Sequence, residues 1–105
     1  MANYLLIYTG TASQPSSPEE GEKVMQAWMG WFGQLGSAVV DGGNPCSMAK
    51  TVAANGSVSD GGPSGVGGYS VLSANSLDDA VNLAKGCPHL AAGGQVEVYE
   101  TFNAM

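Results

Sequence analysis

The sequence contains no arginine, three lysines and one histidine among its 105 residues. Nine aspartates and glutamates give it a formal net charge of −6 at pH 7. Proteins bind nucleic acids with rows of Lys and Arg, which neutralise phosphates and release counterions. Anionic membrane surfaces attract basic segments for the same reason. The charge balance therefore argues against nucleic acid and membrane surfaces as partners.

Cysteines and long apolar runs are also scarce. Cys46 and Cys87 lack the spacing of a zinc site, and the single histidine adds no further ligand cluster. No glycine motif has the spacing of a nucleotide-binding loop. No apolar run could cross a bilayer, and the first residues lack the basic start of a signal peptide. We therefore expect a cytoplasmic protein with reduced cysteines, no metal and no bound cofactor.

The length fits one domain, residues 1–105, with a thin core. Residues 4–8 (YLLIY) are apolar at successive positions, which predicts a short strand covered on both faces. Ser17, Pro18 and Glu20 form a capping pattern that predicts a helix start, and Gly36 is placed to end that helix. Its apolar face is wider than one sheet contact needs, so we expect a partner chain or a pocket beside it.

The second half of the chain alternates glycine-rich turns with short regular segments. A second helix is expected to open with the capping pattern at Ser76 and to close at Gly86. In the last strand, Val96 and Val98 are expected to face one layer, and Glu97 and Tyr99 the other. The other segments begin with a strand at 38–40 and a segment at 48–52 that either continues this strand or returns beside it. A loop or irregular hairpin follows at 55–67, and further strands are expected at 68–74 and 95–102.

This order predicts an α+β, ferredoxin-like βαββαβ fold, in which a four-stranded antiparallel sheet carries two helices on one face. The opposite face then needs a cover, because apolar side chains occupy successive strand positions. A second copy of the same sheet, related by two-fold symmetry, is the simplest cover. The sequence therefore predicts a homodimer that forms a dimeric α/β barrel.

Three segments resemble the YCII-related family. They are VGGYSVLSANSLDDA at 66–80, AKGCP at 84–88 and GGQVEV at 93–98. The segment SDGGP at 59–63 is similar to the one that names the DGPF subgroup, with an extra glycine and no phenylalanine. The resemblance implies the dimeric α/β-barrel fold, whose members include small isomerases, monooxygenases and dehydrochlorinases.

Some YciI-type members of that family carry a histidine in the first helix and an aspartate before the proline that follows the second. That pair was proposed to perform acid–base chemistry. In this sequence Trp28 stands near the first position, and Cys87 occupies the second. The resemblance therefore implies that catalysis here would use other residues.

His89 is the first candidate for acid–base chemistry, because a free imidazole titrates near pH ~6.5 and can shuttle protons. The alternative is a histidine that only packs in a loop, since no carboxylate is paired with it in the sequence. Trp28 could line a pocket for an aromatic substrate, or simply belong to the core. Cys87 could act as a nucleophile only if a neighbour stabilised its thiolate.

Asn44, Lys50 and Asp60 are candidates for substrate binding. Asn44 and Lys50 lie at or after the end of the second predicted strand, where site residues often occur, and Lys50 could hold a substrate carboxylate. Asp60 is a candidate because it lies in the SDGGP segment that resembles the DGPF signature. The alternative is that Asn44 and Asp60 are turn residues and that Lys50 is a solvated surface residue.

Two functions are consistent with these residues. In the first, the protein is a cofactor-free enzyme that transfers protons on a small aromatic-derived or lactone-like molecule. In the second, it is a non-catalytic module that binds a small ligand or a protein partner, as the wide apolar face of the first helix indicates.

Overall fold

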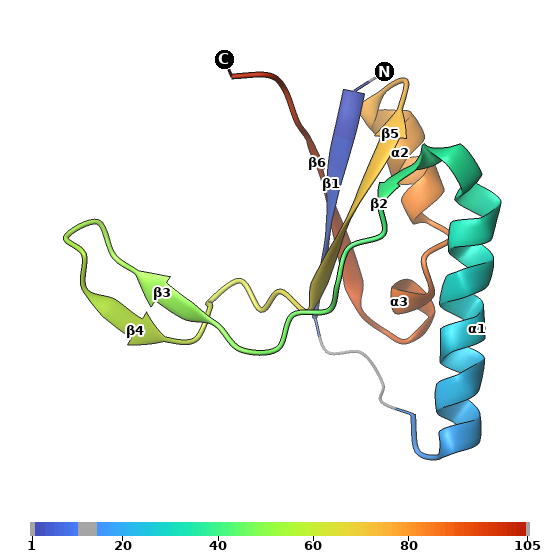
Figure 1. The fold of residues 1–105 in the computed structure, drawn as a ribbon, viewed down its shortest axis with the longest axis horizontal. Coiled ribbons are helices and arrows are strands. Elements are labelled where there is room, and N and C mark those ends of the chain that lie inside the picture. The colour runs from blue at the N-terminus through green and yellow to red at the C-terminus, as the bar shows by residue number, and fades with distance from the viewer. Residues whose placement is uncertain (1, 11–14, 105) are drawn as a thin grey trace.

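The computed structural model describes residues 2–10 and 15–104, which form a layer of helices on one face of an antiparallel sheet (Figure 1). The sheet has four strands in the order β2-β5-β1-β6, and β3 and β4 pair separately. The predicted α+β, ferredoxin-like fold is confirmed.

The strands are β1 (Ala2–Thr9), β2 (Val39–Asp41), β3 (Lys50–Val52), β4 (Val58–Asp60), β5 (Gly68–Ala74) and β6 (Gln95–Glu100). The helices are α1 (Pro18–Leu35), the short 3-10 turn η1 (Gly36–Ala38), α2 (Leu77–Ala84) and α3 (Pro88–Ala91).

The core lies between the sheet and the helices. Strand β1 is central, and every second side chain on it points into this layer. On β6, Val96 and Val98 pack against the core while Glu97 and Tyr99 are exposed, as the alternation predicts. The buried hydrophobic residues are Tyr4, Leu6, Tyr8, Trp31, Leu72, Ala74, Ala80, Ala84 and Cys87.

The second face of the sheet is apolar but incompletely covered. Leu5 pairs with Val71 on one side and Tyr99 on the other, and Ile7 pairs with Tyr69. These side chains are half-buried, except for the exposed Tyr99. The described helices all lie on the other side of the sheet (Figure 1). The expectation that both faces of the first strand are covered is therefore not met within a single chain.

Helix α1 begins where its capping residues predict. The Ser17 hydroxyl accepts a hydrogen bond from the Glu20 backbone N–H at 3.2 Å. The Glu20 carboxylate accepts from the backbone N–H and hydroxyl of Ser16, one residue earlier than a standard capping box. The two hydrogen bonds from Ser16 lower the pKa of the Glu20 carboxyl. This helix is not apolar enough to cross a bilayer, nor is any other described helix.

Two local predictions need correction. Residues 50–52 neither continue β2 nor pair beside it, because Lys50 pairs with Asp60 in a separate hairpin. Of the segment 55–67, expected to be a loop or an irregular hairpin, only β4 (Val58–Asp60) is a strand, and its partner β3 lies before that segment. His89 was expected in a loop but lies in the short helix α3, which starts at Pro88. A single helical turn is too short to show an amphipathic period in the sequence.

Candidate functional site

A cleft of about 440 Å³ opens where the middle of α1, around Trp28, and the short helix α3 approach the Gly68 end of β5. It brings together Trp28, Asn44 and His89, three of the residues selected from the sequence. The cleft residues come from β1, α1, α3 and the two segments that flank the β3–β4 hairpin. They are Tyr8, Met25, Trp28, Phe32, Gly42, Gly43, Asn44, Pro45, Gly67, Gly68, Tyr69 and His89.

One wall of the cleft is aromatic. The Trp28 ring meets Tyr8 edge to face at a centroid distance of 5.2 Å and lies 5.9 Å from Phe32. Trp31, one helical turn on, is different. It is buried, and its indole N–H donates to the Leu83 carbonyl at 3.1 Å. Trp31 therefore belongs to the core, while the half-buried Trp28 offers ring surface to the cleft.

Tyr8 anchors the glycine loop on the opposite wall. Its hydroxyl donates to Ser70 Oγ at 2.6 Å, and the Ser70 hydroxyl donates to the Gly42 carbonyl at 2.7 Å. Burial raises the pKa of Tyr8 to about 12, and the hydrogen bond to Ser70 only partly opposes this shift. Tyr8 therefore stays protonated at neutral pH and acts as a structural donor.

His89 is oriented by a backbone carbonyl. Its Nε2 lies 2.7 Å from the carbonyl oxygen of Thr9, at the end of β1. A carbonyl oxygen can only accept, so Nε2 carries the proton and Nδ1 of the neutral ring is left as an acceptor. The ring also lies 5.7 Å from Tyr8, measured between centroids. This arrangement fixes the tautomer that a general base needs.

Asn44 enters the cleft from the loop after β2. Its backbone carbonyl accepts from the Tyr69 N–H at 3.3 Å, and the neighbouring Pro45 pairs with Gly68 as an isolated bridge. The Asn44 side chain is exposed at the cleft. It is thus placed to hydrogen-bond a bound molecule.

Lys50 and Asp60 lie outside the cleft, on β3 and β4. They form an ion pair of 3.5 Å, and their side chains are 70% and 93% exposed. A pair this exposed contributes little to stability. The structure thus does not bring these two candidates to Trp28, Asn44 and His89.

Cys87 is buried beside the cleft. Burial raises the pKa of its thiol from 9.0 to about 11, although the backbone N–H groups of His89 and Leu90 partly oppose this. The group is therefore a thiol at neutral pH, which argues against a nucleophilic role.

The buried thiol makes stability depend on alkaline pH. The raised folded-state pKa stabilises the fold fully below about pH 9, and this contribution is lost as the pH rises to about 11. We expect the free energy of unfolding to fall by roughly 1.4 kcal/mol through this thiol between pH 7 and pH 10. Urea denaturation of the Cys87→Ala variant should show most of that fall removed, and the exposed Cys46 provides the matched control as Cys46→Ala. An equal alkaline loss in all three proteins would contradict this account.

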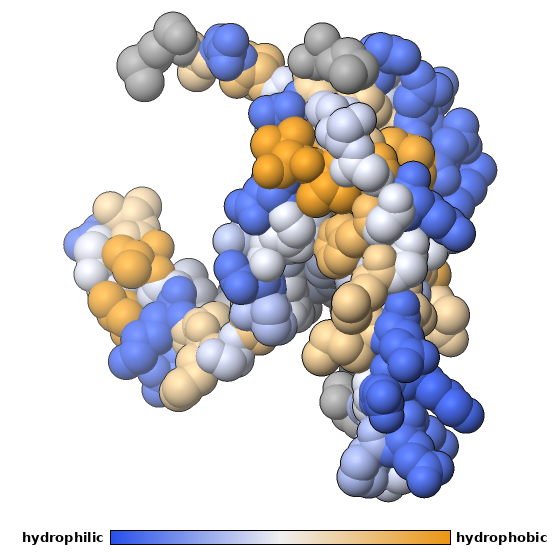
Figure 2. Space-filling model, turned by 45° about the vertical axis from the view of Figure 1, so that its right-hand side comes forward, coloured by the Kyte–Doolittle hydropathy of each residue, from blue (hydrophilic) through white to orange (hydrophobic). Residues whose placement is uncertain are grey.

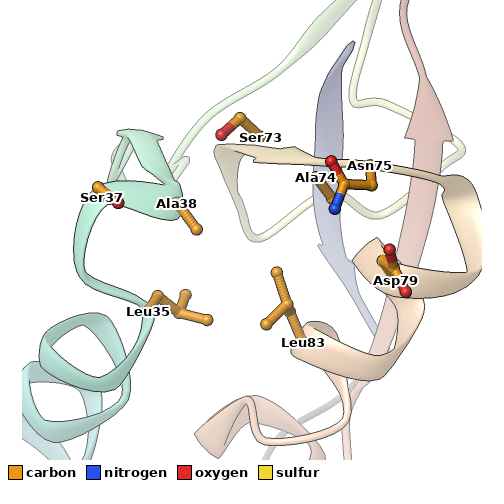
Figure 3. A pocket seen from close by; sticks show the side chains of 8 residues that line it. All are labelled: Leu35, Ser37, Ala38, Ser73, Ala74, Asn75, Asp79 and Leu83. Atoms are coloured by element: carbon orange, nitrogen blue, oxygen red, sulfur yellow. The ribbon is translucent and has the colours of Figure 1, made fainter. Parts of the chain in front are cut away.

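A second hollow, of about 340 Å³, lies at the other end of β5 (Figure 3). Leu35 and Ala38 point across it toward Leu83, and Asp79 is its only titratable group. It contains none of the residues selected from the sequence. A single carboxylate with an apolar floor offers less chemistry than the first cleft.

Sequence reasoning missed Tyr8 and the glycines that form the cleft. A tyrosine at a strand end resembles any core tyrosine, and the pairs Gly42-Gly43 and Gly67-Gly68 resemble ordinary turns. Their shared role depends on the pairing of Pro45 with Gly68, which no local pattern encodes. Among residues 2–10 and 15–104, no group of three or more His, Cys, Asp or Glu is placed to hold a metal ion. The absence of a cofactor stays a prediction.

Comparisons with known proteins give a fold and no sequence family. No family model and no curated protein sequence matches the chain. Solved structures do match, and one is 5-chloro-2-hydroxyhydroquinone dehydrochlorinase from Burkholderia phenoliruptrix AC1100, in complex with 2,5-dihydroxybenzoquinone. It is 20% identical, the match covers 90% of each chain, and the TM-score is 0.50. The chain is thus similar in fold to a small enzyme that acts on an aromatic compound.

Proposed function

We propose that the protein is a cofactor-free enzyme that transfers protons on a small hydroxylated aromatic or quinone-like molecule. The observation that supports this most is His89, which lies at an aromatic cleft with its Nε2 proton held by the Thr9 carbonyl. The volume of the cleft, about 440 Å³, falls within the usual range of small-molecule sites.

The reaction that these groups support is a tautomerisation. The substrate ring would pack against Trp28, and the Asn44 amide would hydrogen-bond a ring oxygen. Nδ1 of His89 would take a proton from one substrate atom and return it to another, so that no co-reactant is consumed. The Thr9 carbonyl would stabilise the imidazolium formed between the two transfers.

Membership of the YCII-related family and a cytoplasmic location are part of this proposal. The family would explain the order of the elements and the motifs at 66–80 and 93–98. The thiols of Cys46 and Cys87 are both free, as expected in a reducing compartment. Lys50 and Asp60 stay candidates for substrate binding only if the hairpin that carries them reaches a bound molecule.

A non-catalytic binding module is the second candidate. Two observations favour it. Apart from two tyrosines, His89 is the only residue lining the cleft that could act as an acid or base, and Met25 and Met29 are exposed on α1. A module would bind a ligand in the same cleft without converting it.

We also propose that two copies of the chain form a homodimer. The apolar side chains of Leu5, Ile7 and Val71 occupy a sheet face that no described helix covers. A second sheet packed on this face would bury them and complete the barrel that the sequence predicts. Light scattering at micromolar concentration measures the mass of the particle in solution. A mass of two chains would support the homodimer, and a mass of one chain would contradict it.

A thermal-shift screen tests the function. We expect 2,5-dihydroxybenzoquinone and related phenols to raise the melting temperature, because a ligand that binds the folded state stabilises it. The shift should disappear in His89→Ala and Trp28→Ala. Lys50→Gln is the matched control outside the cleft and should keep the shift. If the wild type consumes the ligand and His89→Ala does not, the protein is an enzyme and His89 takes part in its reaction.

Other outcomes separate the alternatives. Binding without consumption would favour the module. A shift that survives both cleft substitutions and is lost in Lys50→Gln would move the site to the hairpin and contradict the proposal. No shift with any compound would remove aromatic molecules as the substrate class.

A further inference from the structure

The β3–β4 hairpin, here called the arm, projects from the sheet on the side opposite the helices (Figure 1). Every residue of its two strands except Thr51 is exposed. The radius of gyration of the chain is 15.3 Å, whereas a compact domain of this length has about 13 Å. Figure 2 shows the arm separated from the body by an open gap, with hydrophobic side chains on its surface.

The two faces of the arm differ. Val52 pairs with Val58, and these side chains lie on the same face as the Lys50–Asp60 ion pair. The valines are 68% and 59% exposed. Thr51 and Ser59 lie on the opposite, polar face. An isolated two-stranded hairpin is only marginally stable in water. Burying the exposed valine pair against another surface would therefore stabilise the arm.

The base of the arm is also the wall of the cleft. The chain enters the arm through Gly42 to Pro45 and returns through Gly67 to Tyr69, and both segments line the cleft. They are tied together there, because the Cys46 N–H donates to the Gly67 carbonyl at 2.9 Å and Pro45 pairs with Gly68. A contact that holds the arm therefore also holds this wall.

We propose that the arm packs its Val52–Val58 face on a second copy of this chain, and that this contact holds the cleft wall in its binding geometry. The inference rests on the proposed homodimer. Leu5 and Ile7 alternate with the buried Tyr4 and Leu6, and Val71 pairs with Leu5, so these three side chains lie on the sheet face turned away from the helices. Figure 1 shows the arm on that same side of the sheet. A copy that covers this face therefore lies within reach of the arm. Two-fold symmetry makes the contact reciprocal, with each arm on the other protomer.

Sedimentation equilibrium on the full chain tests the contact. Val58→Asp places a charge within the valine pair, and Ser59→Asp places the same charge on the opposite face of the arm, one residue away. We expect Val58→Asp to weaken dimerisation by about tenfold or more, because an unpaired charge would be buried. Ser59→Asp should change the dissociation constant by less than about twofold. Val52→Asp provides a second variant on the facing strand, and circular dichroism checks that each variant folds.

Equal dissociation constants for Val58→Asp and Ser59→Asp would overturn the proposal, as would a wild type that stays monomeric. The cleft is tested by titrating the same proteins with the quinone of the thermal-shift screen. Val58→Asp should bind it more weakly than Ser59→Asp does, and equal affinity would overturn the link to the cleft wall. If no protein binds the quinone, the proposed ligand fails, while the dissociation constants still decide whether the arm contacts a second copy.

Discussion

Replacing Gly43 with alanine is expected to lower the free energy of unfolding by about 2 to 4 kcal/mol. Gly43 has φ of 76°, in the left-handed region that side chains disfavour. An added Cβ would also lie 1.7 Å from the carbonyl oxygen of Tyr69, which belongs to β5 and cannot move freely. The loop must therefore shift away from β5. We expect that shift to deform the cleft wall, and ligand binding to be lost with stability.

Gly42→Ala is the control, one residue away in the same loop. Gly42 does not have a positive φ, and its Cβ would meet only the tip of the Phe32 ring at 3.9 Å, an ordinary contact. Urea denaturation of the two variants gives the comparison. We expect Gly42→Ala to stay within about 0.5 kcal/mol of wild type. Similar losses in both variants would show that the loop is generally intolerant and that the close approach of Gly43 to β5 is unimportant.

Replacing Gly94 with alanine is expected to displace the ring of His89. The new Cβ would lie 2.0 Å from Nε2 of that ring, which is too close for both to keep their places. The side chain is the easier group to move, so the hydrogen bond from Nε2 to the Thr9 carbonyl should break. We expect a loss of roughly 1 to 3 kcal/mol and loss of the ligand-induced shift in melting temperature.

A double-mutant cycle isolates this effect. Once His89→Ala has removed the ring, the Gly94 Cβ has room, so Gly94→Ala should cost much less in that background than in the wild type. The imidazole nitrogen signals of Gly94→Ala by NMR should report the lost hydrogen bond. Additive costs in the cycle would contradict the close contact between Gly94 and His89.

Local patterns were sufficient for most of the fold. Ser17 and Ser76 cap the helices that they were expected to start, and Gly36 follows the last residue of α1. The strand expected at 68–74 coincides with β5, and the alternation of Val96 and Glu97 places their faces correctly. Capping and alternation act within a few residues, so a single sequence contains the information needed to recognise them.

Only the tertiary structure decided which candidate residues share a site. Trp28, Asn44 and His89 come from α1, a loop and α3, and they meet because β5 pairs with both β1 and the segment after β2. Lys50 and Asp60 were candidates for substrate binding alongside Asn44. Strand pairing nevertheless places both of them on the arm, outside the cleft. Which strands pair with one another depends on contacts between residues far apart in the sequence, and local sequence patterns do not predict those contacts. The sequence by itself thus determined the two longer helices and the order of the strands in the four-stranded sheet. Long-range pairing determined the separate β3–β4 hairpin and the cleft.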